Sequence, residues 1–103
     1  MKPMHIDVFN EYFIPEQSDH IDARVLAANV AETVTVPALA KFVLFNGTDD
    51  FWVKLGSAAS IPAADISDGS ASEFNPEARR VVAGQTISVI AAAACTVIFA
   101  FYR

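Results

Sequence analysis

The chain has little of several residue types that define common protein classes. Its 103 residues include one cysteine, Cys95, and only seven Lys and Arg against twelve Asp and Glu. One cysteine excludes an internal disulfide framework and a cysteine-rich zinc site. The net charge of −5 argues against sequence-independent nucleic-acid binding, which needs clustered basic residues to replace phosphate counterions. Cys95 lies in an apolar run, so we expect it to be buried and unreactive.

Long apolar segments are also missing. The first seven residues lack the apolar region of a signal peptide. Residues 86–102 are almost continuously apolar, but they fall short of the about 20 residues that a membrane helix needs. The β-branched and aromatic residues at both ends of this run favour two buried strands joined by an alanine-rich turn. A tail-anchored membrane protein is the alternative interpretation.

What is present favours one folded domain made of short strands. Charged residues make up 18% of the chain and mean hydropathy is positive, which excludes global disorder. Residues 32–36 alternate, with Val34 and Val36 on one face. Asn46 and Gly47 supply positive-φ turn chemistry between two apolar segments, which predicts a hairpin. The expected strands lie at 32–36, 41–45, 51–55, 86–89 and 96–102, with weaker candidates at 24–26 and 80–82.

These patterns predict an all-β fold: a single-domain β-sandwich or jelly roll over residues 24–103. Residues 1–23 are expected to form an extended N-terminal arm, whose aromatic residues Phe9, Tyr12 and Phe13 would dock on a neighbouring subunit. Residues 56–79 are rich in Gly, Ser, Ala, Pro and Asp, and they predict one long irregular loop of the kind that often carries function.

Candidate metal sites are weak. His5 and Asp7, and again His20 and Asp22, stand two residues apart and would point the same way on a strand, as metal ligands could. Residues 65–70 have the composition of an acidic calcium loop but lack its spacing. Asp and Ser capping their own turn, with Gly69 at positive φ, is the ordinary interpretation. We therefore expect no metal, no cofactor and no small-molecule substrate.

No catalytic motif is present, and the carboxylates are scattered over loops, so we expect a protein that is not an enzyme. Trp52 is the most informative single residue. It shares a strand face with Lys54, opposite Phe51 and Val53; if those two face the core, Trp52 is partly exposed, as interface tryptophans often are. Alternatively, the long loop covers it. The remaining interface candidates are Phe74, which is expected to pin the loop to the core, Arg79 and Arg80, which would bind an anion or pair with local carboxylates, and Tyr102.

Three segments of the chain carry a resemblance to known proteins. The segments VTVPALAKFVLFNGTDDFWVKLG, IPAADISDGSASEFNPEARRV and TVIFAFYR resemble, in their order along residues 33–103, small virion proteins of tailed bacteriophages. The shared elements are a Val-x-Val-Pro strand end, a Phe-rich hairpin, an Asp-Gly-Ser loop, an Asn-Pro turn and a closing Phe-Tyr strand. Residues 1–32 have no clear counterpart.

The resemblance implies a capsid cement (decoration) protein on the outer surface of the virion, made in the host cytoplasm. Its expected partners are the major capsid protein and copies of itself, as a dimer or trimer, with no nucleic acid and no membrane. The resemblance supplies no catalytic residues. The alternative is a small tail, neck or fibre component that acts as an adaptor or binds a host glycan.

Overall fold

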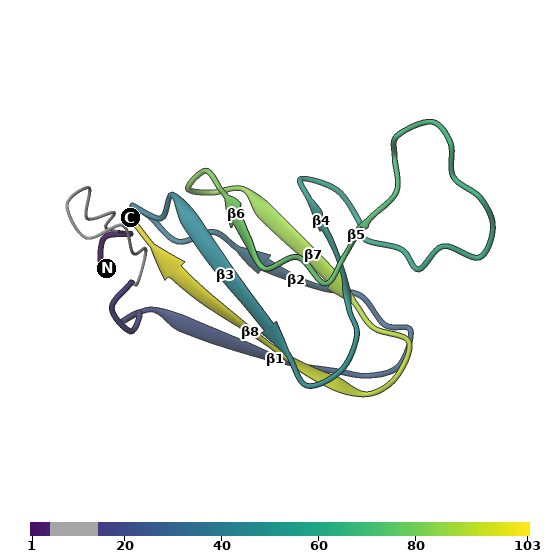
Figure 1. Ribbon diagram of the computed structural model, residues 1–103, viewed down its shortest axis with the longest axis horizontal. Helices are drawn as coiled ribbons and strands as arrows, with labels where there is room; N and C mark the ends of the chain where they lie inside the picture. Colours follow the sequence, from purple (N-terminus) through teal and green to yellow (C-terminus); the bar gives the residue numbers. More distant parts are fainter. Residues whose placement is uncertain (5–14) are drawn as a thin grey trace.

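The computed structural model describes residues 1–4 and 15–103 and shows two four-stranded sheets packed around a shared core (Figure 1). All strand pairs are antiparallel. The eight strands are β1 (Ile21–Leu26), β2 (Glu32–Thr35), β3 (Phe42–Gly47), β4 (Trp52–Leu55), β5 (Glu73–Phe74), β6 (Ala78–Arg80), β7 (Thr86–Ile90) and β8 (Cys95–Tyr102). The described part of the chain contains no helix, and therefore no helix that is long and apolar enough to cross a membrane. The predicted all-β class is confirmed.

We call the sheet with strand order β1-β8-β3-β6 sheet 1 and the sheet with order β2-β7-β4-β5 sheet 2. Strands that follow one another in the sequence lie in different sheets, except for β4 and β5, which pair within sheet 2. The two central strands of sheet 1 are β8 and β3. Its edges are β1 and β6, whereas β2 and β5 are the edges of sheet 2.

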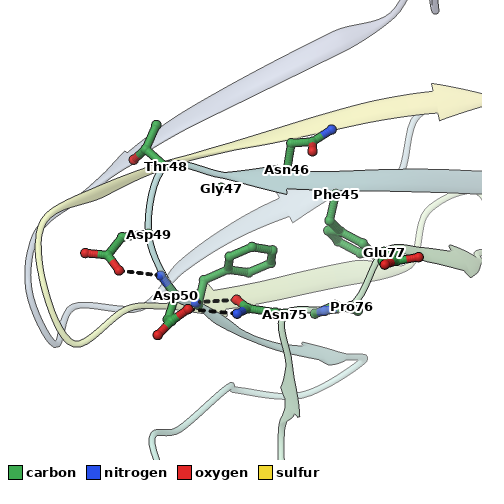
Figure 2. A pocket seen from close by; sticks show the side chains of 10 residues that line it. Phe45, Asn46, Gly47, Thr48, Asp49, Asp50, Asn75, Pro76 and Glu77 are labelled. Carbon is green, nitrogen blue, oxygen red and sulfur yellow. Dashed lines mark hydrogen bonds between the residues drawn. The ribbon is translucent and has the colours of Figure 1, made fainter.

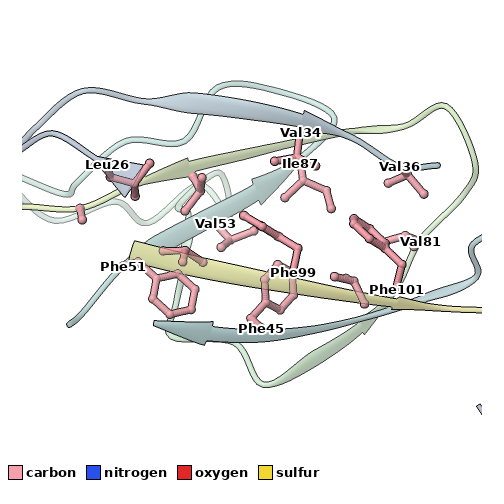
Figure 3. Packing of buried hydrophobic residues seen from close by; sticks show 14 of the residues in the cluster. Leu26, Val34, Val36, Phe45, Phe51, Val53, Val81, Ile87, Phe99 and Phe101 are labelled. Carbon is pink, nitrogen blue, oxygen red and sulfur yellow. The ribbon is translucent and has the colours of Figure 1, made fainter. Parts of the chain in front are cut away.

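The core lies between the sheets and follows the alternation of each strand (Figure 3). Val97, Phe99 and Phe101 project inward from β8 and are completely buried, and the Phe99 ring contacts Phe45 edge-on, with centroids 5.8 Å apart. Sheet 2 contributes Val34, Val53, Ile87 and Val89. Val34 and Val36, which the sequence pattern placed on one face, are both buried.

The predicted hairpin over residues 41–55 is wrong. Its two strands form, as β3 and β4, but β3 pairs with β8 and β6 while β4 pairs with β7 and β5. The intervening loop carries the chain from one sheet to the other. At its end the Phe51 side chain enters the core, and β4 does not pair with β3. Gly47 is required for a different reason than the one expected: a Cβ there would lie 2.6 Å from Cδ1 of Phe51.

The expected irregular stretch 56–79 is also partly wrong, since it contains the short edge strand β5 and most of β6. Strands of two and three residues are too short for alternation to reveal them. The remaining loop, residues 56–72, projects beyond the sheets at the end of the molecule opposite the two termini (Figure 1). Residues 86–102 form β7 and β8 joined by a short alanine-rich turn, as predicted.

The described N-terminal residues lie against the end of β8. The Met4 N–H donates to the Arg103 carbonyl at 2.9 Å, and the Arg103 N–H donates to the Lys2 carbonyl at 3.0 Å. Buried Ser18 donates its hydroxyl to the Phe101 carbonyl at 2.7 Å. β1 begins at residue 21, inside the range expected for the arm. Phe9, Tyr12 and Phe13 lie outside the described residues.

Candidate interaction surface

Trp52 and Phe74 form an aromatic pair on the outer face of sheet 2. They are directly opposite each other across β4 and β5, and their ring centroids are 4.9 Å apart at an interplanar angle of 53°. Trp52 is half-buried and Phe74 is 51% exposed. Phe51 and Val53 face the core, which is the condition under which Trp52 was expected to be partly exposed. Phe74, in contrast, packs on Trp52 and not into the core, so its expected role as a core anchor is wrong.

Lys54 shares this outer face and holds the projecting loop. Its ammonium donates a hydrogen bond to the Ser70 carbonyl. The loop is also fixed at its base, where the Ala59 N–H donates to Oγ of Ser88 at 2.8 Å and the Ser60 N–H donates to Oγ of Ser72 at 3.0 Å. These bonds place the base of the loop over β7, whereas its outer part, around Ile66, is exposed.

The acidic part of the loop caps its own turn. Oδ1 of Asp68 accepts hydrogen bonds from the hydroxyl and the N–H of Ser70, and Gly69 has a φ of 84°. The hydroxyl bond, followed by the N–H bond and the charge of Lys54, lowers the pKa of the exposed Asp68. The ordinary interpretation of this segment as a self-capped turn is therefore confirmed.

Arg79 pairs with Glu73. The Arg79 guanidinium donates from Nε to Oε1 of Glu73 at 2.9 Å and from its Nη2 to the second carboxylate oxygen, and this bonding raises the pKa of Arg79. Glu73 lies on β5 and Arg79 on β6, so the ion pair joins the edge of sheet 2 to the edge of sheet 1. Of the two alternatives for Arg79, pairing with a local carboxylate is confirmed.

This ion pair is part of a wider pattern at the sheet edges. Glu73 is in register with buried Val53, and Arg79 with buried Val43, so both charged side chains occupy inward positions. The other two edge strands also carry charged residues in register with completely buried partners: Asp22 and Arg24 on β1, and Glu32 on β2. Inward-pointing charges on edge strands disfavour the addition of a further strand.

Arg80 and Tyr102 belong to the outer face of sheet 1. The Arg80 guanidinium lies over the Phe42 ring, 5.7 Å from its centroid, which is a cation–π contact. Tyr102 is only 3% exposed, and its hydroxyl donates to the Glu16 carbonyl at 2.6 Å. Its use as an interface residue is not supported, because the N-terminal segment already covers it.

The rest of this face is apolar and was not singled out from the sequence. Register places side chains from all four strands on it, and apart from Tyr102 each of them is exposed or half-buried. Val25 is 75% exposed and Ile21 is 46% exposed. The apolar character of residues 41–45 and 96–102 on both sides was the sequence signal for it. We define the sheet 1 outer face as Ile21, Ala23, Val25, Phe42, Leu44, Ala78, Ile98 and Ala100.

A separate hollow of about 290 Å³ lies between the β3–β4 loop and the β5–β6 turn (Figure 2). Its polar groups bond to one another: the Phe51 N–H donates to Oδ1 of Asn75, and Nδ2 of Asn75 donates to Oδ1 of Asp50, both at 2.9 Å. The Asn75 N–H in turn donates to the Phe51 carbonyl, which accounts for the positive φ of Asn75. These hydrogen bonds therefore hold the β3–β4 loop to the β5–β6 turn. The expected turn at Asn75 and Pro76 is confirmed.

Candidate metal ligands do not assemble within residues 1–4 and 15–103, where no group of three His, Cys, Asp or Glu side chains could hold an ion. Nε2 of His20 lies 3.8 Å from Oδ1 of Asp22, whereas His5 and Asp7 lie outside the described residues. Cys95 is buried, as expected. Comparison with known proteins gave no relative: no family model matches the chain, and neither a curated protein nor a solved structure matches it.

Proposed function

We propose that this chain is a non-enzymatic virion structural protein of a tailed bacteriophage, a cement subunit that bridges and stabilises major capsid proteins on the outer surface of the shell. One observation carries the proposal: a small two-sheet domain presents apolar and aromatic side chains outward from both of its sheets. Such surfaces are characteristic of proteins that work against a partner.

The strand order supports a jelly roll. Orders β1-β8-β3-β6 and β2-β7-β4-β5 arise when a long antiparallel pair, β1–β4 against β5–β8, folds over into two four-stranded sheets. Jelly rolls are frequent in viral capsid proteins. This topology is compatible with a virion protein, and the resemblance of residues 33–103 is what favours that function over other all-β binding modules.

The Trp52–Phe74 pair is the proposed centre of the capsid contact. Aromatic side chains supply much of the binding energy at interfaces, because they bury large areas and lose little conformational freedom. The projecting loop, residues 56–72, begins and ends beside this pair and provides a second contact. The N-terminal arm, with Phe9, Tyr12 and Phe13, is the proposed third contact. A net charge of −5 suits the outside of a shell that packages DNA.

A protein that binds only the assembled shell lowers the free energy of that state. We therefore expect virions that lack this protein to lose their DNA at lower temperature or under milder osmotic shock. The sharper comparison adds purified protein back: wild type and Thr33→Ala, which alters an exposed position on the outer face of sheet 2, should restore resistance, whereas Trp52→Ala should not. Equal resistance with and without the protein would contradict the proposal.

The second candidate is a tail, neck or fibre component that binds a host glycan. The half-exposed Trp52, with Lys54 on the same face, favours it, because sugar rings stack on aromatic faces. Copy number separates the two functions. Hundreds of copies in each particle indicate a cement protein, and a handful indicates a tail component.

A further inference from the structure

The sheet 1 outer face is built differently from an ordinary solvent-facing sheet. On β1 the usual alternation is reversed: apolar Ile21 and Val25 point outward, whereas charged Asp22 and Arg24 take the inward positions at the edge. An antiparallel sheet with one face in water normally shows polar residues outside. The outward residues of β1 are therefore suited to a face that is covered.

Charge on this face is almost absent. None of its outward register positions holds a carboxylate, although the chain carries twelve Asp and Glu. The only charged residue at its outward positions is Arg80, at the β6 edge over Phe42. Two copies of an acidic protein repel each other over most of their surfaces, and this face is one on which two copies can approach without opposing carboxylates.

The size of the face fits a weak contact between two copies. β8 has eight residues, which at about 3.3 Å each gives a length of about 26 Å, and four strands about 4.8 Å apart give a width of about 19 Å. Two such faces would together bury at most about 1,000 Å², which is close to the lower limit for a biological interface. The contact is therefore expected to be reversible and dependent on concentration.

The charges on the edge strands favour a contact between sheet faces over pairing between strand edges. All four edge strands carry inward charges, and the Glu73–Arg79 ion pair joins two of them, so strand addition is disfavoured. We infer that the sheet 1 outer face is the contact between two copies of this chain, related by a twofold axis and packed sheet on sheet. The inference rests on the proposed function for the place of this dimer on a capsid. In such a dimer, the two Trp52–Phe74 pairs would point away from the contact, on opposite sides.

The test uses the purified full-length chain alone, in sedimentation equilibrium over a concentration series. We expect the mass to rise from 11.1 kDa toward twice that value. Val25→Glu should raise the dimer dissociation constant more than about tenfold, because an unpaired carboxylate is costly to bury. Ile21→Lys, at the other end of the same strand, should also raise the dimer dissociation constant. Thr35→Glu, an outward and exposed position on the edge strand β2 of sheet 2, is the matched control and should leave dimerisation unchanged.

Circular dichroism establishes that each variant is folded. A wild-type mass of 11.1 kDa at every concentration, or equal effects of Val25→Glu and Thr35→Glu, would overturn the inference. If the wild type is monomeric and Val25→Glu instead abolishes binding to particles, the face belongs to a capsid protein; the second-copy assignment is then wrong and the proposed function stands. If dimers form but no particle is bound or stabilised, the proposed function fails and the dimer contact stands.

Discussion

The carboxylate of Glu73 on β5 and the guanidinium of Arg79 on β6 form an ion pair between the edges of the two sheets. Both side chains are more than 40% exposed, so the pair contributes little to stability by itself. Its position has a larger effect, because charges at the inward positions of edge strands disfavour pairing with another chain.

We expect Arg79→Ala to lower the free energy of unfolding by only about 0–1 kcal/mol, as is usual for exposed ion pairs. Aggregation on warming should nevertheless increase, because the edge strand β6 loses its inward charge. Thermal unfolding and light scattering on the same samples separate the two effects. Lys41→Ala is the control, since it removes the same charge from an exposed position outside the edge strands; equal aggregation by both variants would contradict this account.

Phe74→Ala should expose Trp52, the single tryptophan of the chain, and shift its fluorescence emission to longer wavelength. Loss of the aromatic contact should destabilise the domain by about 0.5–1.5 kcal/mol. Ile66→Ala, an exposed apolar residue of the projecting loop, is the control. An unchanged emission maximum in Phe74→Ala would show that the pair is not formed in solution.

Ser88→Ala should loosen the base of the projecting loop. Ser88 is 1% exposed and its Oγ accepts the Ala59 N–H, so its removal leaves a buried donor without that partner, at a cost of about 1–3 kcal/mol. Hydrogen exchange at Ala59 should accelerate more than exchange in β8. Thr86→Ala, at an exposed position of the same strand, should leave exchange at Ala59 unaltered.

The lowered pKa of Asp68 makes the turn at residues 68–70 sensitive to acid. A carboxyl whose pKa is lower in the folded state stabilises that state above its unfolded pKa, near 3.8, and the contribution disappears as the pH falls through the folded value. An NMR titration should place the Asp68 pKa below 3.8. Ser70→Ala should move it upward, whereas Ser67→Ala keeps both Ser70 donors and should not.

Gly47→Ala should destabilise the domain by about 1–3 kcal/mol, since its Cβ would overlap the Phe51 ring and force a core side chain to move. Asn46→Ala, at the exposed neighbouring position, is the control. Chemical denaturation measures both. If Gly47→Ala is no less stable than Asn46→Ala, the close approach of Phe51 to Gly47 does not exist in solution.

The sequence was informative wherever burial follows alternation. A period of two, which is the dominant signal of a half-buried strand, grouped Val34 with Val36 and Phe51 with Val53, and each pair is buried. The same pattern does not reveal which strands pair with one another. Asn46 and Gly47 suggested a local hairpin, but β3 and β4 gain more by pairing with β8 and β7, whose distance along the chain leaves no local signal.

The candidate surface was predictable only in part. Trp52 could be placed opposite the core-facing residues of its strand, but its partner Phe74 lies on a strand of two residues with no pattern of its own. Tyr102 was an interface candidate because it lies on the same side of its strand as Ile98, but it is buried and its hydroxyl donates to the Glu16 carbonyl. The outward placement of Val25 depended on the register of β1 against β8.

The position of β8 in sheet 1 has a consequence for how the chain acquires its structure. β8 is made after all the other strands, yet it lies between β1 and β3 and pairs Ala100 with Ile21. Sheet 1 therefore cannot assemble during synthesis until this late segment has emerged, and such distant pairings make folding slow. Until then β1 and β3 remain open to intermolecular association, so a lower temperature of expression, which weakens hydrophobic association, should raise the yield of folded protein.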